Sequence, residues 1–201
     1  MTQYARPHAE PFNSSNLQWY SNNGGDTYVE IDEVSADDAT SYIETYAPAV
    51  SYHADLDTVT DPNGATGTYK VVVRGKMDTD GSMGDGETIR VKLTSGTGSS
   101  GSDYGEEEDE ESLGNHTAIA TFSAVALNHG TWTDHTFNLT SADITRGNTA
   151  SWANLGVQIY YEDPSYNSNS CFITQVYFQC PDAAAGGGVT TSPAFLLFSG
   201  M

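Results

Sequence analysis

The chain alternates apolar and polar residues over short stretches, a pattern with the two-residue period of β-strands. The clearest example runs from Ala153 to Cys180. It predicts two strands joined by the turn-rich loop EDPSYNSNS, paired as an antiparallel hairpin with an apolar inner face. In the second strand the alternation puts Phe172 on the same face as Phe178. The opposite face is rich in Gln and Tyr, residue types suited to contact with a sugar or another protein.

Further short strands are predicted at regular spacing, with turn residues between them. They lie at 17–21, 27–33, 49–56, 68–77, 88–96, 117–127 and 131–139. The strand at 68–77 has three valines and should be central in its sheet, and 131–139 should pair back on 117–127. A helical turn should open at Thr140 and end near Gly147. The excursions at 34–46 and 140–147 suit the crossovers of a jelly roll. We therefore predict an all-β, antiparallel jelly-roll β-sandwich.

Composition divides the chain into three parts. Residues 1–24 are expected to be an extended N-terminal arm, and residues 25–182 the sandwich, with a low-complexity acidic insert at 96–115. Residues 183–201 form a glycine hinge and an apolar tail, which should either add a strand to its own sandwich or dock into a neighbouring copy. The predicted interface residues are Trp19, Phe195, Leu196, Leu197 and Phe198.

The formal net charge is −20, with only 7 Lys and Arg residues. Such a chain has no cationic footprint for nucleic acid or for anionic membranes. The N-terminus has no apolar segment of a secretory signal, so synthesis in a reducing compartment is expected. The two cysteines, Cys171 and Cys180, lie nine residues apart on one predicted strand, roughly 30 Å apart. They should be free thiols, or bonded only between chains, because a disulfide within one chain needs Cα atoms within about 7 Å.

No catalytic motif is present. The five histidines are scattered, no G-x-S-x-G elbow occurs, and a β-sandwich hydrolase is the least favoured class. The loop carrying Asp78, Asp80, Asp85 and Glu87 could supply oxygen ligands to calcium, but its spacing is not that of an EF-hand. A solvated hairpin tip is the favoured interpretation, and no cofactor is expected.

Tyrosines gather on the 153–180 stretch. Tyr160, Tyr166 and Tyr177 are the candidates for stacking on a glycan or for contact with a partner.

Several motifs resemble a jelly-roll module of tailed-phage virion proteins over roughly residues 5–182. In order they are Arg6-Pro7, Trp19, IDEVSADDATSYIET (31–45), Tyr69, Val71 and Arg74 of one strand, IRVKL (89–93), Trp132-Thr133, the Leu139-Thr140 to Thr145 turn, and Cys180-Pro181. The resemblance implies a structural virion protein, most simply a capsid decoration or accessory protein. It would be made in the host cytoplasm and carried on the virion surface, with a major capsid protein and further copies of itself as partners. The alternative is a carbohydrate-binding module of an adhesin or fibre.

Overall fold

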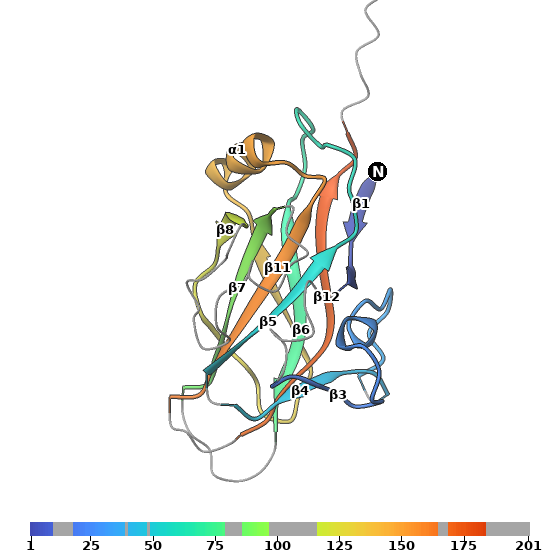
Figure 1. The fold of residues 1–201 in the computed structure, drawn as a ribbon. Helices are drawn as coiled ribbons and strands as arrows, with labels where there is room; N and C mark the ends of the chain where they lie inside the picture. Colours follow the sequence, from blue (N-terminus) through green and yellow to red (C-terminus); the bar gives the residue numbers. More distant parts are fainter. Residues whose placement is uncertain are drawn as a thin grey trace, which may run out of the picture.

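A computed structural model describes residues 1–9, 18–38, 40–47, 49–78, 86–96, 116–164 and 169–183. Two antiparallel sheets pack face to face, with one short α-helix at one end of the molecule (Figure 1). The predicted all-β sandwich is therefore confirmed.

We name the sheets after their central strands. The β6 sheet contains β10 (Thr133–Asn138), β6 (Lys70–Met77), β12 (Cys171–Pro181), β4 (Ile43–Thr45), β3 (Tyr20–Ser21) and β1 (Thr2–Ala5), which pairs with β12. The β11 sheet contains β2 (Pro7–Ala9), β5 (Ala49–Leu56), β11 (Leu155–Glu162), β7 (Thr88–Ser95), β8 (Thr117–Thr121) and β9 (Val125–Ala126), which pairs with β7. The helical elements are η1 (Thr27–Glu30), a 3-10 helix, and α1 (Ser141–Ala150).

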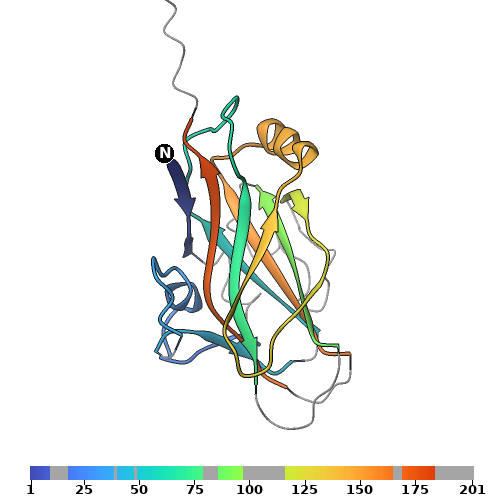
Figure 2. The same ribbon diagram turned by 180° about the vertical axis from the view of Figure 1, so that it is seen from behind.

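The strand order is that of a jelly roll. The run β4-β12-β6-β10 faces the run β5-β11-β7-β8, and most consecutive strands alternate between the sheets, as Figure 2 shows from behind. β6 is central, as its valines predict, and β5 spans the residues predicted for it.

The predicted 153–180 hairpin is wrong. β11 pairs with β5 and β7, whereas β12 lies in the other sheet beside β6, β4 and β1. The predicted pairing of 131–139 with 117–127 is wrong for the same reason, because β10 pairs with β6. Alternation reports which face of a strand is buried, but it does not report the neighbouring strand.

A bulge in β12 reverses part of its predicted alternation. The register against β6 shifts between Ile173 and Gln175, so Thr174 is an extra residue. Its hydroxyl donates to the Ser41 carbonyl at 2.7 Å. As a result Ile173 is fully buried in the core, and Phe172 points to the outer face, opposite to Phe178.

Two other segments differ from their predicted strands. Residues 27–30 form η1, because the buried Glu30 carboxylate accepts hydrogen bonds from Ser21, Asn23 and Ser41 at 2.7–2.9 Å. The predicted 117–127 strand is split into β8 and β9. The helix predicted at Thr140 is longer than one turn and ends at Ala150, and Thr140 and Asp143 form a capping box at its start.

The described part of the N-terminal arm belongs to the sandwich. β1 pairs with β12 and β2 pairs with β5, so this short segment joins both sheets. Trp19 is 3% exposed and meets Tyr52 edge to face, with ring centroids 5.8 Å apart. Its predicted role in an interface is therefore corrected to a role in the core.

Cys171 and Cys180 are both buried and both free, as predicted. Burial raises the pKa of Cys171, and burial with the nearby Asp182 carboxylate raises the pKa of Cys180 to about 12. Both thiols stay protonated at neutral pH and act as small apolar side chains.

Candidate functional site

The outer face of the β6 sheet carries a row of large side chains. Tyr20, Glu44, Phe172 and Lys76 lie directly opposite one another on β3, β4, β12 and β6. Residues paired in this way share a face, and neighbouring strands are about 4.8 Å apart, so the row is roughly 14 Å wide. We call this surface the aromatic face and define it by Tyr20, Tyr42, Glu44, Tyr46, Lys76, Trp132 and Phe172.

The rings of the aromatic face contact one another and stay partly open to solvent. Tyr20 and Tyr46 are stacked at 5.5 Å with an interplanar angle of 7°, and they are 43% and 55% exposed. Tyr42 meets Phe172 edge to face at 5.5 Å and Trp132 at 6.2 Å. Such contacts hold the rings in place, so binding a partner would cost little side-chain entropy.

One positive and one negative charge flank Phe172 in the row. The Lys76 ammonium lies 4.7 Å from the Trp132 ring centroid and 5.2 Å from that of Phe172. Glu44 stands on the other side. Within the described residues, neither side chain has an ion pair. Both charges are available to a partner.

An ion-pair cluster fixes the loop that leads into β4. Arg74 donates from Nε and Nη2 to the two carboxylate oxygens of Asp38 and from Nη1 to Asp134. Hydrogen bonds to these two carboxylates raise the Arg74 pKa further above its ordinary value. Asp38 has a φ of +34°, which few residue types adopt without strain. The cluster therefore positions the chain just before Tyr42.

Replacing Arg74 with Gln should lower the free energy of unfolding by about 2 kcal/mol, because it leaves the partly buried Asp38 carboxylate without its partner and also removes the hydrogen bond to the more exposed Asp134. Arg90→Gln is the matched control. Its ion pair with Glu162 is more exposed than the Arg74–Asp38 pair, at 36% and 37%, and should contribute less than about 1 kcal/mol. Urea denaturation of both variants measures the difference, and equal losses would contradict the structural role of Arg74.

Part of the outer face of the β11 sheet is polar but buried. His53, Gln158 and Lys92 form a row across β5, β11 and β7, and each is less than a tenth exposed. Gln158 donates to the Ser51 hydroxyl at 3.1 Å. Burial, together with the charges of His116 and Lys92, lowers the pKa of His53 to about 3. This row is therefore buried within the fold and is not an open binding surface.

His53 should make the protein sensitive to acid. Below pH 6.5 the unfolded chain binds a proton on this ring, whereas the folded chain does not until about pH 3. Stability is thus retained above pH 6.5 and falls by about 2 kcal/mol by pH 5 through this group. In His53→Gln, the loss of unfolding free energy between pH 7 and pH 5 should shrink by that amount. Urea denaturation at pH 7 and pH 5 measures the loss, and an unchanged loss in His53→Gln would contradict this role of His53.

The structure separates the tyrosines predicted to share a binding face. Tyr160 is half-buried on the outer face of the β11 sheet, whereas Tyr177 is on the outer face of the β6 sheet, edge to face with Tyr4 at 5.7 Å. Tyr166 lies outside the described residues. Tyr160 and Tyr177 thus point away from each other on opposite sheets, and the single predicted face does not exist.

The predicted calcium loop is described only at its two ends. Glu87 is buried and accepts a hydrogen bond from Asn169 at 2.7 Å, while the backbone carbonyl of Asp78 contacts Nδ1 of His129 at 3.1 Å. Asp80 and Asp85 lie outside the described residues, so calcium binding stays a prediction. In the part of the chain that is described, no three His, Cys, Asp or Glu side chains are placed to hold a metal ion.

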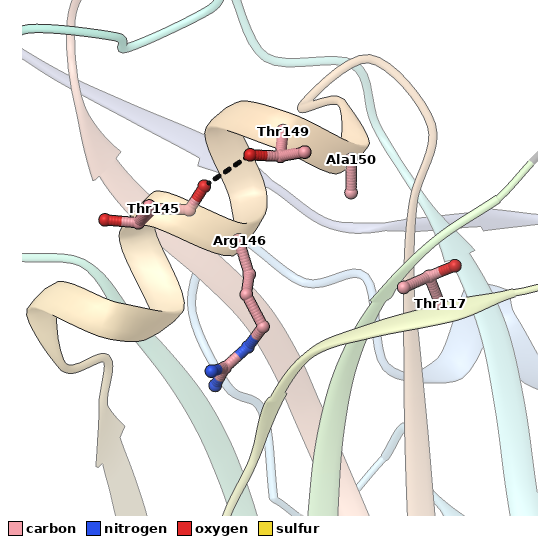
Figure 3. Close-up of a pocket in the computed structure, with 5 residues that line it drawn as sticks. All are labelled: Thr117, Thr145, Arg146, Thr149 and Ala150. Carbon is pink, nitrogen blue, oxygen red and sulfur yellow. Dashed lines mark hydrogen bonds between the residues drawn. The ribbon is translucent and has the colours of Figure 1, made fainter.

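A pocket of about 390 Å³ lies between α1 and β8 (Figure 3). It is lined by Thr117, Thr145, Arg146, Thr149 and Ala150. The Arg146 guanidinium is already engaged by the Ile119 carbonyl at 2.8 Å and by Asp143. The lining holds no pair of groups suited to acid–base or nucleophilic chemistry.

The aromatic face was missed from the sequence, although one signal for it is present. In SYIETY, the side chains of Ser41, Ile43 and Thr45 are buried while Tyr42, Glu44 and Tyr46 are not. An exposed Tyr-Glu-Tyr alternation is unusual for a solvated strand, and it marks a surface. The predicted tail residues Phe195, Leu196, Leu197 and Phe198 and the acidic insert lie outside the described residues.

No family model and no curated protein matches this chain. Among solved structures, it is similar to the CBM36-1 domain of a multidomain xylanase from the hindgut metagenome of Trinervitermes trinervoides. The TM-score is 0.36 at 12% identity, over 92% of this chain and 99% of that one. It is also similar to the K2 cleaved adhesin domain of Lys-gingipain, with a TM-score of 0.34 at 12% identity, over 89% and 99% of the two chains. No helix among the described residues is long and apolar enough to cross a membrane.

Proposed function

We propose that this chain is a non-catalytic structural protein of a virion surface, and that it binds a neighbouring virion protein through its aromatic face. The observation that carries the proposal is the group of partly exposed rings of the aromatic face, with Tyr20 and Tyr46 about half exposed. Aromatic side chains are enriched at the centres of protein interfaces, where they supply large contact area.

The charges of the aromatic face fit the same role. Glu44 and Lys76 flank Phe172 and, within the described residues, lack ion-pair partners. Opposite charges at fixed positions set the register and orientation of a partner more than they set affinity. A net charge of −20 elsewhere on the chain disfavours unspecific association.

The virion setting is supported by the resemblance to tailed-phage jelly-roll modules. Several of the shared positions have structural roles here. Arg74 holds the loop before β4, and Thr140 with Asp143 caps α1. These motif residues therefore support a common fold.

Incorporation into particles tests the proposal. Trp132→Ala and Tyr46→Ala chains are each produced in place of the native chain during phage growth. Purified particles should then contain at least tenfold fewer copies of each variant than of the native chain. Tyr4→Ala is the matched control, because Tyr4 is exposed to a similar degree on the same sheet but lies outside the aromatic face. Mass spectrometry counts the copies. Native copy numbers for both face variants would overturn the proposal.

Glycan binding is the second candidate function, and the exposed Tyr20 and Tyr46 rings favour it, since sugar rings stack on aromatic faces. Trp132 offers a direct readout, because Trp19 and Trp152 are both buried. Saturable binding on a glycan array, with a change in tryptophan fluorescence that is lost in Trp132→Phe, would support this function. A blank array would exclude it.

A further inference from the structure

The core of the sandwich is partly exposed to solvent on one side. Five apolar side chains pack against the core but stay partly exposed, and all of them come from residues 122–150: Phe122, Val125, Leu139, Ile144 and Ala150. This stretch runs through β9 and β10 to α1, along the side where the edge strands of the two sheets face each other (Figure 2). We call it the open side. The pocket beneath α1 adjoins it, since Ala150 belongs to both.

β10 is an unprotected edge strand on the open side. Its six residues form a continuous ladder with β6 and, within the described residues, pair with no strand on the other edge. It contains no Pro, Lys or bulge, three devices that often protect an edge, and its one acidic residue, Asp134, is engaged by Arg74 of its own sheet. Its free backbone groups can pair with one more strand.

The other described edges are shorter or protected. The Gln3 side chain on β1 both donates to and accepts from the Thr60 backbone, at 2.8 and 2.7 Å. β2 contains Pro7 and an irregular register, and β8 has a register shift against β7. β3 and β9 have two residues each. β10 is therefore the edge best suited to strand addition.

The inner side of this edge is apolar. Phe122 and Phe137 contact each other with ring centroids 5.3 Å apart, and Phe122 is only partly buried. Nε2 of the neighbouring His135 is buried and, among the described residues, has no hydrogen-bond partner. An added strand with apolar side chains would pack beside Phe137 and cover the exposed part of Phe122.

We propose that the chain's own C-terminal tail, residues 194–198, adds to the β6 sheet as a strand antiparallel to β10. The segment reads Ala-Phe-Leu-Leu-Phe, so either parity places two large apolar side chains toward Phe122 and Phe137. The pairing gives hydrogen-bond partners to the free backbone groups of β10. It goes beyond the proposed function because it assigns the tail to this chain's own core.

The length of the segment before the tail and the direction in which β12 ends favour pairing of the tail with β10 of the same chain over pairing with a second copy. Asn138 at the end of β10 lies opposite Lys70, which lies opposite Gln179, so the upper ends of β10 and β12 are about 10 Å apart. Residues 184–193, which include three glycines, can span roughly 33 Å. A tail that turns back after β12 runs antiparallel to β10. A tether of this length gives an effective concentration in the millimolar range, well above that of a second copy in dilute solution.

Hydrogen exchange on the purified full chain tests the proposal. The alternate amides of 133–138 that point away from β6 should exchange at least tenfold more slowly in the full chain than in a chain lacking residues 189–201. In the full chain their exchange rate should be the same at protein concentrations from 1 to 100 μM. Leu196→Asp/Leu197→Asp should act like the truncation. Val34→Asp, at a residue that is 78% exposed, should leave the exchange unchanged.

Light scattering on the same samples gives the oligomeric state. A monomer with protected β10 amides supports the proposal, and the truncated chain should associate more readily because its edge is bare. Protection that rises with concentration together with a dimer mass would overturn it in favour of a second copy. Identical exchange in the full and truncated chains, with both folded by circular dichroism, would also overturn it.

Discussion

Replacing Gly147 with alanine is expected to destabilise the protein by about 2–3 kcal/mol, although alanine is normally favoured over glycine within a helix by about 1 kcal/mol. A Cβ at this position would lie 2.2 Å from Cζ2 of Trp152. The ring cannot move away, because it stacks on Phe178 at 5.6 Å and its Nε1 donates to Asn148 at 2.8 Å. Close packing therefore outweighs helix propensity at this site.

Thermal and urea unfolding measure this effect, with Thr149→Ala as the control on the exposed side of α1. The control should change the free energy of unfolding by less than about 0.5 kcal/mol. A Gly147→Ala variant as stable as the native chain would show that Trp152 is not held in place by its neighbours.

Much of the fold could be predicted because burial alternates along each strand. Ile89, Val91 and Leu93 are fully buried in β7, as their parity predicts, and β5 spans the predicted residues. Burying one face of each strand is a local requirement that the sequence records residue by residue. The capping box at Thr140 is local in the same sense.

Strand neighbours could not be predicted, because they depend on groups far apart in the chain. β11 and β12 are consecutive and apolar, yet they lie in different sheets. η1 replaces an alternating strand, since the buried Glu30 needs donors from Ser21, Asn23 and Ser41. No pattern within 27–33 records those donors.

The candidate site was missed for a related reason. The tyrosine cluster predicted on 153–180 rests on closeness in the sequence, whereas the aromatic face gathers Tyr20, Tyr46, Trp132 and Phe172 from four separate segments. Phe172 reaches it only because the bulge at Thr174 turns it outward. A single inserted residue thus moves one ring from the core to the aromatic face.

Because the bulge places Phe172 and Phe178 on opposite faces of β12, their replacement should have very different effects on stability. Phe178→Ala should lower the free energy of unfolding by about 4 kcal/mol, because the ring is fully buried against Trp152. Phe172→Ala is the matched control on the same strand and should cost less than about 1.5 kcal/mol, since its ring is partly exposed.

Simple alternation would put both rings on one face and predict similar losses, so urea denaturation separates the two descriptions of β12. Under the proposed function, the effect of the two substitutions on incorporation into particles should have the reverse order. Phe172→Ala removes the centre of the Tyr20–Lys76 row and should reduce incorporation into particles as strongly as Trp132→Ala. The residue that contributes less to stability is then the one that contributes more to recognition. A Phe172→Ala chain that is severely destabilised would mean that the bulge does not turn this ring outward.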